Sequence, residues 1–459
     1  MRRFFLAALA AAACNSPVTG TIQLTTGGET DTFTRAPAPV TLRIDSIDSS
    51  DAATTLASVP LPADTVDLGS LDQSTTGSLD VSGLDDGGKT IVHGTTVSLQ
   101  YGALAGGTLP VFVQRVGELA RLPDVVDARP APLLSTVTGR FVLVVGGTDT
   151  SMNTASQIYD FAAFATLQSP PTMPRAPLSL AVSGTVVWLI DGIGNSANMD
   201  FGASTYDLSD DSTGSTMPPS AGGATLNYAD VAGGATVTAP DGSQFVVGGT
   251  RTTGMPTQAV LVIDSMGNQY VATLSMPRLG ASATWVNGRG LVVIGGSAKA
   301  AGVEVVGTGS GTGSPLAANG TPLAYPPDPT VGAGAAALDM NGDVLVAGGT
   351  TPAGKDAGIR AINVGCGTNC TAMPWGATLP APLVLTYAQS FGIDAADALV
   401  VGSEASGTTH VFRVTTATAT EVPLKIPRNN ARAVLSPLEF GTVVVVGGGS
   451  NVMESYIAQ

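Results

Sequence analysis

A short apolar strand that ends in two glycines recurs along this chain. The complete copies are FVLVVGG at 141–147, QFVVGG at 244–249, LVVIGG at 291–296, VLVAGG at 344–349 and VVVVGG at 443–448, and the weaker copies are VVWLIDG at 186–192 and ALVVG at 398–402. The last glycines of successive copies lie 45 to 57 residues apart. Seven copies with this period predict a repeat architecture in which each repeat is one supersecondary unit.

Composition and charge favour a β protein and argue against a nucleic-acid partner. The chain has 459 residues, of which 58 are glycine and 12% are charged, and this suits many strands joined by tight turns. Acidic residues outnumber basic residues by 35 to 20, so the field of the protein repels phosphate backbones. After the first fourteen residues, no apolar run reaches the roughly 20 residues that a membrane-spanning helix needs.

The N-terminus has the composition of an export signal. Two arginines, about ten apolar residues and then small residues precede Cys14. The segment resembles a bacterial lipoprotein box, which implies that residues 1–13 are a signal peptide and that Cys14 carries a lipid anchor. Ala11 stands where that box usually has leucine, and the alternative is an ordinary cleaved signal that leaves Cys14 free or in a disulfide. Asn15, rather than Asp, follows the cysteine and resembles the outer-membrane address of Gram-negative lipoproteins, so the expected location is the cell envelope, in the outer membrane.

The other two cysteines, Cys366 and Cys370, are predicted to form a local disulfide that closes a tight turn. A metal site needs more ligands than this pair supplies, and no histidine is nearby in the sequence. A redox motif usually has a two-residue spacer at the start of a helix, whereas this spacer has three residues and lies in a β region.

Residues 14–108 lack the double-glycine strand and are predicted to form a small β-sandwich. Short segments such as 40–45 and 95–101 alternate apolar and polar residues, as half-buried strands do. An immunoglobulin-like topology is compatible with this pattern, although no cysteine pair or buried tryptophan supports it. His93 is expected in a surface turn. The expected role of this domain is a spacer or docking module between the membrane and the repeats.

Each double-glycine strand belongs to a group of four predicted strands. The strand before it is joined by a tight turn, and Asn-Gly or Asp-Gly at that turn favours a two-residue hairpin. The strand after it ends in Tyr-Asp in the first two copies, at 159–160 and 206–207. Most units then end in Met-Pro or an equivalent, at 173–174, 217–218, 276–277, 373–374 and 426–427. Four antiparallel strands per repeat predict the blades of a propeller.

This pattern resembles the kelch repeat, and the resemblance covers residues 117–459. It implies an all-β fold in which residues 109–459 form a seven-bladed β-propeller preceded by a small β-sandwich. The tryptophan that kelch blades carry after the tyrosine is missing from every copy, so the outer strands must pack differently. Residues 116–122 look like the fourth strand of a blade, and the chain ends soon after Gly448. We therefore expect 116–122 to complete the last blade and close the ring.

The sequence contains no complete catalytic or cofactor-binding motif. A repeat region with His410 as its only histidine excludes a multi-histidine metal site, and His410 has no obvious nucleophile beside it. The segment 332–337 matches a dinucleotide fingerprint but leads into a hairpin, and Asp339, Asn341 and Asp343 have calcium-loop spacing without the final glutamate. Galactose oxidase shares the kelch-type plan, but its copper centre needs two histidines. We expect no metal and no cofactor.

Arginine stands beside proline at four of the seven repeat junctions, as Arg129, Arg175, Arg278 and Arg428. In kelch propellers these junctions lie on the face where ligands usually bind, around the central channel. The resemblance therefore implies a partial ring of guanidinium groups that accepts carboxylates from a partner. The alternative is structural, with each arginine paired to a nearby aspartate or capping backbone carbonyls between blades.

Together these features predict an exported, lipid-anchored cell-envelope protein that binds a protein or glycan partner through its propeller face and is not an enzyme. The alternative is an envelope enzyme that acts on carbohydrate with acidic residues in the propeller channel. A purely structural or surface-layer role is the third interpretation. Propellers host many functions, so the fold alone does not decide between these interpretations.

Overall fold

The computed structural model describes most of the chain beyond residue 16. The described residues are 17–147, 154–168, 171–191, 193–194, 202–221, 224–249, 256–296, 302–309, 314–323, 336–340, 343–349, 358–366, 370, 372–374, 379, 383–394, 396–438 and 441–458. The expected signal peptide at 1–13 and the lipid-attachment residue Cys14 lie outside these residues. None of the helices in the described ranges is long and apolar enough to cross a membrane. The chain divides into two units, and residues 26–32 belong with the second.

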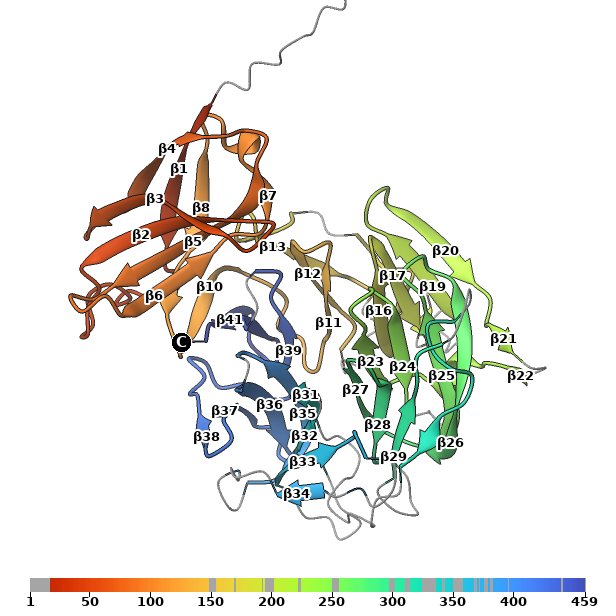
Figure 1. Cartoon of the computed structure of the whole chain (residues 1–459). Helices are drawn as coiled ribbons and strands as arrows, with labels where there is room; N and C mark the ends of the chain where they lie inside the picture. The colour runs from red at the N-terminus through yellow and green to blue at the C-terminus, as the bar shows by residue number, and fades with distance from the viewer. Residues whose placement is uncertain are drawn as a thin grey trace, which may run out of the picture. The chain divides into compact units, whose positions relative to one another are not determined.

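The first unit, which covers residues up to 25 and residues 33–113, is built from two β-sheets (Figure 1). One sheet has the order β4-β1-β8 and the other contains β3-β2-β5-β6, with β7 paired to β5. Side chains of both sheets, including Ile22 and Val66 from the first and Leu42 and Leu79 from the second, share one hydrophobic cluster. The elements are β1 Val18–Thr25, β2 Thr41–Asp48, β3 Ala53–Pro60, β4 Thr65–Leu71, β5 Thr76–Leu84, β6 Thr90–Thr95, β7 Leu99–Gln100, the 3₁₀ helix η1 Tyr101–Leu104 and β8 Thr108–Phe112.

Two expectations for this unit are wrong. The continuous strand expected at 95–101 is broken, because β6 ends at Thr95 and β7 has only two residues. The N–H of Thr96 still donates to the carbonyl oxygen of Leu79 at 3.0 Å, but the N–H of Leu79 donates to the hydroxyl of Thr96 at 2.9 Å, so a side chain replaces one backbone acceptor there. His93 lies within β6 rather than in a turn, and its Nε2 is 3.2 Å from Oδ1 of Asp80.

The second unit contains seven four-stranded antiparallel sheets among the described residues, numbered 1 to 7 here. Sheet 1 has β11 Leu133–Val137, β12 Phe141–Val145, β13 Gln157–Asp160 and β14 Ala165–Thr166; sheet 2 has β16 Ser179–Ser183, β17 Val186–Ile190, β19 Ala203–Asp207 and β20 Ser212–Thr216; sheet 3 has β23 Ala235–Thr238, β24 Gln244–Val247, β25 Thr257–Ile263 and β26 Gln269–Arg278; sheet 4 has β27 Ser282–Val286, β28 Gly290–Ile294, β29 Val303–Val306 and β30 Thr321–Pro322. Sheet 5 has β31 Ala336–Met340, β32 Asp343–Ala347, β33 Ile359–Asn363 and β34 Ala372–Pro374; sheet 6 has β35 Leu385–Gly392, β36 Ala398–Glu404, β37 Thr409–Val414 and β38 Ala419–Glu421; sheet 7 has β39 Arg432–Leu435, β40 Val443–Val446, β41 Val452–Tyr456 and β10 Leu119–Val125. Short elements outside them are β9 Gln114–Arg115, β15 Arg175–Ala176, β18 Ile193–Gly194, β21 Ser220–Ala221, β22 Ala224–Thr225 and the 3₁₀ helix η2 Tyr228–Asp230.

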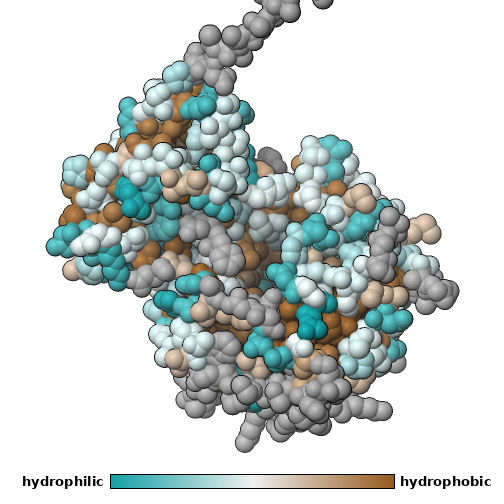
Figure 2. Space-filling view, in the orientation of Figure 1, coloured by the Kyte–Doolittle hydropathy of each residue, from teal (hydrophilic) through white to brown (hydrophobic). Residues whose placement is uncertain are grey.

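The first strands of the seven sheets contact one another in a closed cycle. The contacts run from β11 to β16, β23, β27, β31, β35 and β39 and back to β11. Successive hydrophobic clusters take side chains from neighbouring sheets, so each sheet buries its faces against the next. On the coloured part of the surface in Figure 2, hydrophobic residues are interspersed with hydrophilic and pale ones. The fold of this unit is therefore all-β and β-propeller-like, with the first strand of each sheet innermost.

Sheet 7 combines the two ends of the repeat region. Three of its strands come from the C-terminal end, and its fourth strand, β10, lies upstream of sheet 1. β10 pairs antiparallel with β41, with Leu119 opposite Tyr456 and Arg121 opposite Glu454. Leu119 and Leu122 are 1% and 3% exposed, so this strand contributes to the core as well as to the backbone ladder.

The last glycine pair shows why a side chain is excluded at these positions. Gly447 has φ +73°, and a Cβ on it would lie 2.3 Å from the carbonyl oxygen of Arg129, in the segment that leads into sheet 1. Gly448 has φ +71°, and a Cβ on it would lie 2.9 Å from Cβ of Arg428, in the segment that leads into its own sheet. The first glycine therefore makes room for the next sheet, and the second makes room for its own.

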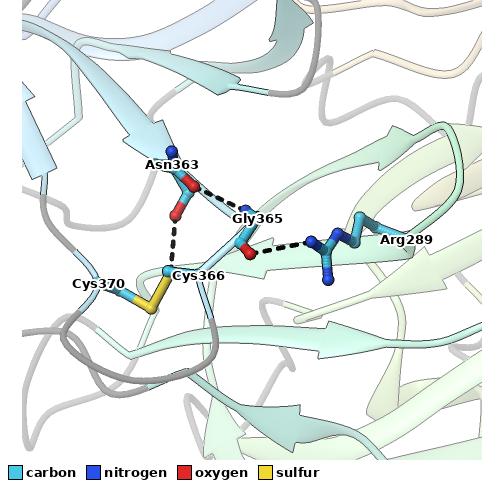
Figure 3. Close-up of a disulfide and its surroundings, with 5 residues drawn as sticks. All are labelled: Arg289, Asn363, Gly365, Cys366 and Cys370. Atoms are coloured by element: carbon cyan, nitrogen blue, oxygen red, sulfur yellow. Dashed lines mark hydrogen bonds between the residues drawn. A yellow bond between two sulfur atoms is a disulfide. The ribbon is translucent and has the colours of Figure 1, made fainter.

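The predicted cysteine pair is at disulfide distance. Cys366 and Cys370 are joined by a disulfide with a Cα–Cα distance of 5.3 Å, just after β33 (Figure 3). Gly365 donates its N–H to Oδ1 of Asn363 at 2.8 Å, and its carbonyl accepts a bond from Nη2 of Arg289 at 3.0 Å. Arg289 belongs to sheet 4, so this bond also ties the disulfide turn to the neighbouring sheet.

Candidate functional site

The four arginines from the repeat junctions are all buried. Their exposed fractions are 3% for Arg129, 6% for Arg175, 0% for Arg278 and 3% for Arg428. Each stands before the first strand of a sheet, and each donates hydrogen bonds to the backbone of that same sheet. We call this arrangement the arginine clasp, because each guanidinium group binds backbone carbonyls beside the second or third strand of its sheet.

The clasps of sheets 4 and 7 have the same geometry. Nη1 of Arg278 donates to the carbonyl oxygens of Gly295 at 2.6 Å and of Gly302 at 2.7 Å. Arg428 donates to the carbonyl oxygen of Gly447 at 2.7 Å and to that of Val452. In both clasps the first acceptor is the first glycine of the pair, and the second lies at the start of the third strand.

The clasps of sheets 1 and 2 use related acceptors. Nη1 of Arg129 donates to the carbonyl oxygens of Gly146 at 3.3 Å and of Ala155 at 2.8 Å. Arg175 donates to the carbonyl oxygen of Gly202 and to the hydroxyl of Ser204, both at 3.0 Å. All four guanidinium groups thus cap backbone carbonyls, which is the structural role that the sequence left open as the alternative to ligand binding.

A buried glutamate completes two of the clasps. Arg278 pairs with Glu304 at 3.2 Å and Arg428 pairs with Glu454 at 3.0 Å, and all four side chains are 0% exposed. Burial lowers the pKa of both arginines, while the charge and the hydrogen bonds of the glutamates act in the opposite direction. Each glutamate also accepts a hydrogen bond from the backbone N–H of the residue three positions before its arginine, Ser275 or Lys425. The ion pair is therefore hydrogen-bonded to the backbone as well.

A different arginine, Arg432, has donors that these internal bonds do not use. It opens β39, the innermost strand of sheet 7, and is partly exposed. Its Cζ lies 3.7 Å from the centroid of the Tyr387 ring, on the innermost strand of sheet 6. Its Nη1 donates to the carbonyl oxygens of Ala431 at 3.1 Å and of Asn430 at 3.4 Å. Among the described residues, its Nε and Nη2 have no acceptor, and no carboxylate forms a salt bridge with it.

The strands on either side hold this arginine in place. Gln389 of β35 donates to the carbonyl of Ala433 at 3.1 Å and accepts its N–H at 2.9 Å, so sheets 6 and 7 are joined beside the arginine. Burial raises the pKa of Tyr387, although the charge of Arg432 opposes this, and the phenol therefore stays protonated at neutral pH. We call Tyr387, Gln389 and Arg432 the Arg432 site.

The sequence holds a signal for Arg432 that a search for proline-arginine junctions does not detect. On the first strand of a sheet, one residue pairs with the second-strand residue that comes just before the glycines. This position can be compared from sheet to sheet. In sheet 7 it is Arg432, opposite Val446. In the first five sheets this position holds Leu133, Ser179, Ala235, Ser282 and Ala336. Aligning the repeats on their glycines therefore shows a charged residue where the first five sheets have an apolar or hydroxyl side chain.

His410 belongs to a second polar cluster at the edge of sheet 6. Its Nδ1 is 2.8 Å from Oε1 of Glu421, and its Nε2 is 3.0 Å from Oε1 of Glu404. The carboxylates lie on opposite sides of the ring, so they cannot share one metal ion with it. A groove of about 280 Å³ lies beside the cluster, lined by residues that include Arg413, Thr418 and Val422. In the part of the chain that the structure describes, no group of three or more metal-ligating side chains is arranged to hold a metal.

Comparison with known proteins gives structural neighbours of low similarity. No protein-family model and no curated protein sequence matches the chain. A solved structure titled "Structure of YjhT" is similar at a TM-score of 0.43 with 17% identity, and the match covers 65% of this chain and 99% of that one. BBS1N from a complex with ARL6DN gives 0.43 and 8% identity over 73% of this chain and 93% of that one, and a chain of the mitotic checkpoint complex gives 0.43 and 11% over 75% and 92%. The strand pairing described above defines the fold.

Proposed function

We propose that this chain is an exported, lipid-anchored protein of the cell envelope that binds a protein or glycan partner through its propeller and is not an enzyme. The observation that carries the binding role is Arg432, whose guanidinium keeps two nitrogens without an acceptor among the described residues on an innermost strand. Its neighbour Tyr387 is a protonated phenol at neutral pH, so it suits hydrogen bonding better than proton abstraction. These groups favour recognition over acid–base catalysis.

The same proposal includes the finer architecture. We infer that each of the seven sheets is one blade of a kelch-like propeller formed by residues 109–459, and that residues 14–108 form a β-sandwich. The hydrophobic cluster shared by the two sheets of the first unit supports the sandwich. The pairing of β10 with β41 supports closure of the last blade by residues 116–122.

Replacing residues 116–122 with a Gly-Ser linker of equal length tests the closure. The replacement removes the buried side chains of Leu119 and Leu122 and exposes the edge of β41, so we expect the free energy of unfolding to fall by about 4 kcal/mol or more. Urea unfolding of the second unit measures this change. An unchanged unfolding midpoint would contradict closure by this segment.

Export and anchoring are tested at Cys14. Cells that make the protein are grown with an alkyne fatty acid, and membrane and soluble fractions are compared for the wild type and for Cys14→Ser. We expect label and membrane association in the wild type and neither in the variant. A labelled variant, or an unlabelled wild type, would contradict the lipid anchor at Cys14.

The binding role is tested with a photo-crosslinking amino acid in living cells. It replaces Asn429, which is exposed and lies three residues before Arg432, or Thr418, which is exposed at the outer edge of sheet 6. We expect a discrete adduct with a partner from position 429 and none from position 418. Absence of an adduct at 429, or adducts at both positions, would count against a partner on this face.

A further inference from the structure

We infer that the Arg432 site binds a carboxylate, presented by an aspartate or glutamate side chain in a peptide segment of the partner. This inference rests on the proposed binding function and deepens it, because it names the class of partner and the group that is recognised. Three features of the site carry it: the orientation of the guanidinium group, its missing counter-charge, and the use of the adjacent ring face and amide within the fold.

The guanidinium group is held in one orientation before any ligand arrives. The ring of Tyr387 lies against its plane at 3.7 Å, and the carbonyl oxygens of Ala431 and Asn430 accept bonds from Nη1. The opposite edge, with Nε and Nη2, has no acceptor among the described residues. Two parallel N–H groups at that edge match the two oxygens of a carboxylate, which is the bidentate geometry that arginine favours. A group that is already oriented loses little side-chain entropy on binding.

The charge of Arg432 lacks the compensation that neighbouring arginines have. Arg413 on β37 binds Asp397 at 2.6 Å, and Arg428 binds Glu454 at 3.0 Å. Arg432 has no carboxylate partner in the described part of the chain, and burial lowers its pKa, while the nearby Tyr387 acts in the opposite direction. A ligand carboxylate would supply the missing counter-charge in a site that is already partly removed from water.

A peptide fits this site better than an acidic glycan. Sugars are commonly held on an exposed aromatic ring, but the guanidinium group itself occupies one face of Tyr387, and the amide of Gln389 is used by Ala433. The chain also carries a net charge of −15, which repels a polymer with a carboxylate on many residues. A peptide with one carboxylate and neutral flanking residues brings the required group with the least repulsion.

Arginine-specific labelling with phenylglyoxal tests this inference on the unmodified protein. Mass spectrometry measures the labelling of each arginine in the free protein and in the presence of three probes. The probes are a peptide with one central glutamate and neutral flanking residues, the same peptide with glutamine in place of the glutamate, and an oligogalacturonate. We expect Arg432 to be labelled in the free protein and protected by the glutamate peptide alone. The buried clasp residues Arg278 and Arg428 should stay unlabelled throughout and serve as internal controls.

Binding of the dye-labelled glutamate peptide to variants gives the second readout. We expect about tenfold weaker binding for Arg432→Gln, and a loss for Arg432→Lys as well because lysine lacks the planar fork. Arg140→Gln, which breaks an ion pair in sheet 1, should bind normally. If Arg432→Gln does not fold, the labelling result on the wild type still decides.

The remaining outcomes separate this inference from the proposed function. Protection of Arg432 by the oligogalacturonate alone, equal protection by both peptides, or no protection at all overturns the peptide-carboxylate assignment. If these results occur while position 429 still forms a discrete photo-adduct, the binding function stands and only the named ligand is wrong. If position 429 forms no adduct although the glutamate peptide protects Arg432, the site binds carboxylates and the cellular role is wrong.

Discussion

Arg428 and Arg432 lie four residues apart where sheet 7 begins, yet their guanidinium groups have opposite surroundings. Arg428 is 3% exposed and donates to the backbone of its own sheet and to buried Glu454. Arg432 is partly exposed, lies on the ring of Tyr387, and has no carboxylate partner among the described residues. The fold provides hydrogen-bond acceptors for the guanidinium of Arg428 but leaves donors of Arg432 without an acceptor among the described residues. The number of backbone and carboxylate acceptors around the guanidinium therefore distinguishes a structural arginine from a candidate binding residue.

Repetition distinguishes the two residues as well. The clasp recurs in sheets 1, 2, 4 and 7, and in two of them the arginine and its glutamate are separated by 26 residues, as in Arg278–Glu304 and Arg428–Glu454. A requirement shared by several sheets is a requirement of the fold. Arg432 is charged at a position where the first five sheets have apolar or hydroxyl residues, so the architecture does not explain it.

The largest effect is expected from breaking a complete clasp. Glu454→Ala leaves the charge of Arg428 buried without its partner and frees the backbone N–H groups of Lys425 and Ile426, so it should cost about 3 to 5 kcal/mol of stability. Urea unfolding measures the change. Glu421→Ala, which removes a partly exposed partner of His410, is the control and should cost about 1 kcal/mol or less. Similar costs for both would mean that the clasp adds no special stability.

A smaller effect is expected from the glycine that lets the clasp approach the next sheet. Gly447→Ala combines a positive φ with a Cβ only 2.3 Å from the carbonyl oxygen of Arg129, and the expected cost is about 2 to 3 kcal/mol. Gly449 has φ +85° and nothing within 4 Å of an added Cβ, so Gly449→Ala should cost about 1 kcal/mol. The difference between the two thermal or urea unfolding curves isolates the contact between sheets 7 and 1.

The sequence predicted the parts of this fold that depend on local patterns. The all-β class and the β-propeller-like plan follow from the recurring apolar strands with a glycine pair, because strand pattern and a positive φ are local properties that the repeat displays several times. The pairing of Cys366 with Cys370 is local for the same reason. The role of Arg278 stayed open because its acceptors, Gly302 and Glu304, come more than twenty residues later and meet it only once the sheet has formed.

The environment of Arg432 was harder to predict than the clasp. It depends on Tyr387, which belongs to the preceding sheet and lies on a strand whose register shifts between Leu385 and Tyr387. A pattern search within one repeat cannot find a contact between two repeats. The usable signal was comparative: a charged residue at a position that the first five sheets fill with Leu, Ser or Ala.

Acid titration should reveal a third kind of arginine contact, which is intermediate between the other two. Burial opposes ionisation of Glu29, but hydrogen bonds and charge from Arg121 outweigh it and lower its pKa below the usual 4.5. The pair therefore adds stability above pH 4.5 that is lost as the pH falls through the lowered pKa. Because Arg121 is 40% exposed, we expect only about 1 kcal/mol at pH 7. In Glu29→Gln and Arg121→Gln, urea unfolding should show this loss at neutral pH and none in strong acid.

The smallest change in stability is expected at the Arg432 site itself. Arg432→Gln removes a stacked cation and two bonds to backbone carbonyls but leaves no buried charge, so it should cost about 0.5 kcal/mol. Arg428→Gln is the matched variant, and it leaves Glu454 buried without a counter-charge at a cost of about 3 kcal/mol or more. Urea unfolding of both variants measures this contrast. A large loss in Arg432→Gln would place this arginine with the clasps as a structural residue, since a group kept for binding contributes little to the stability of the free protein.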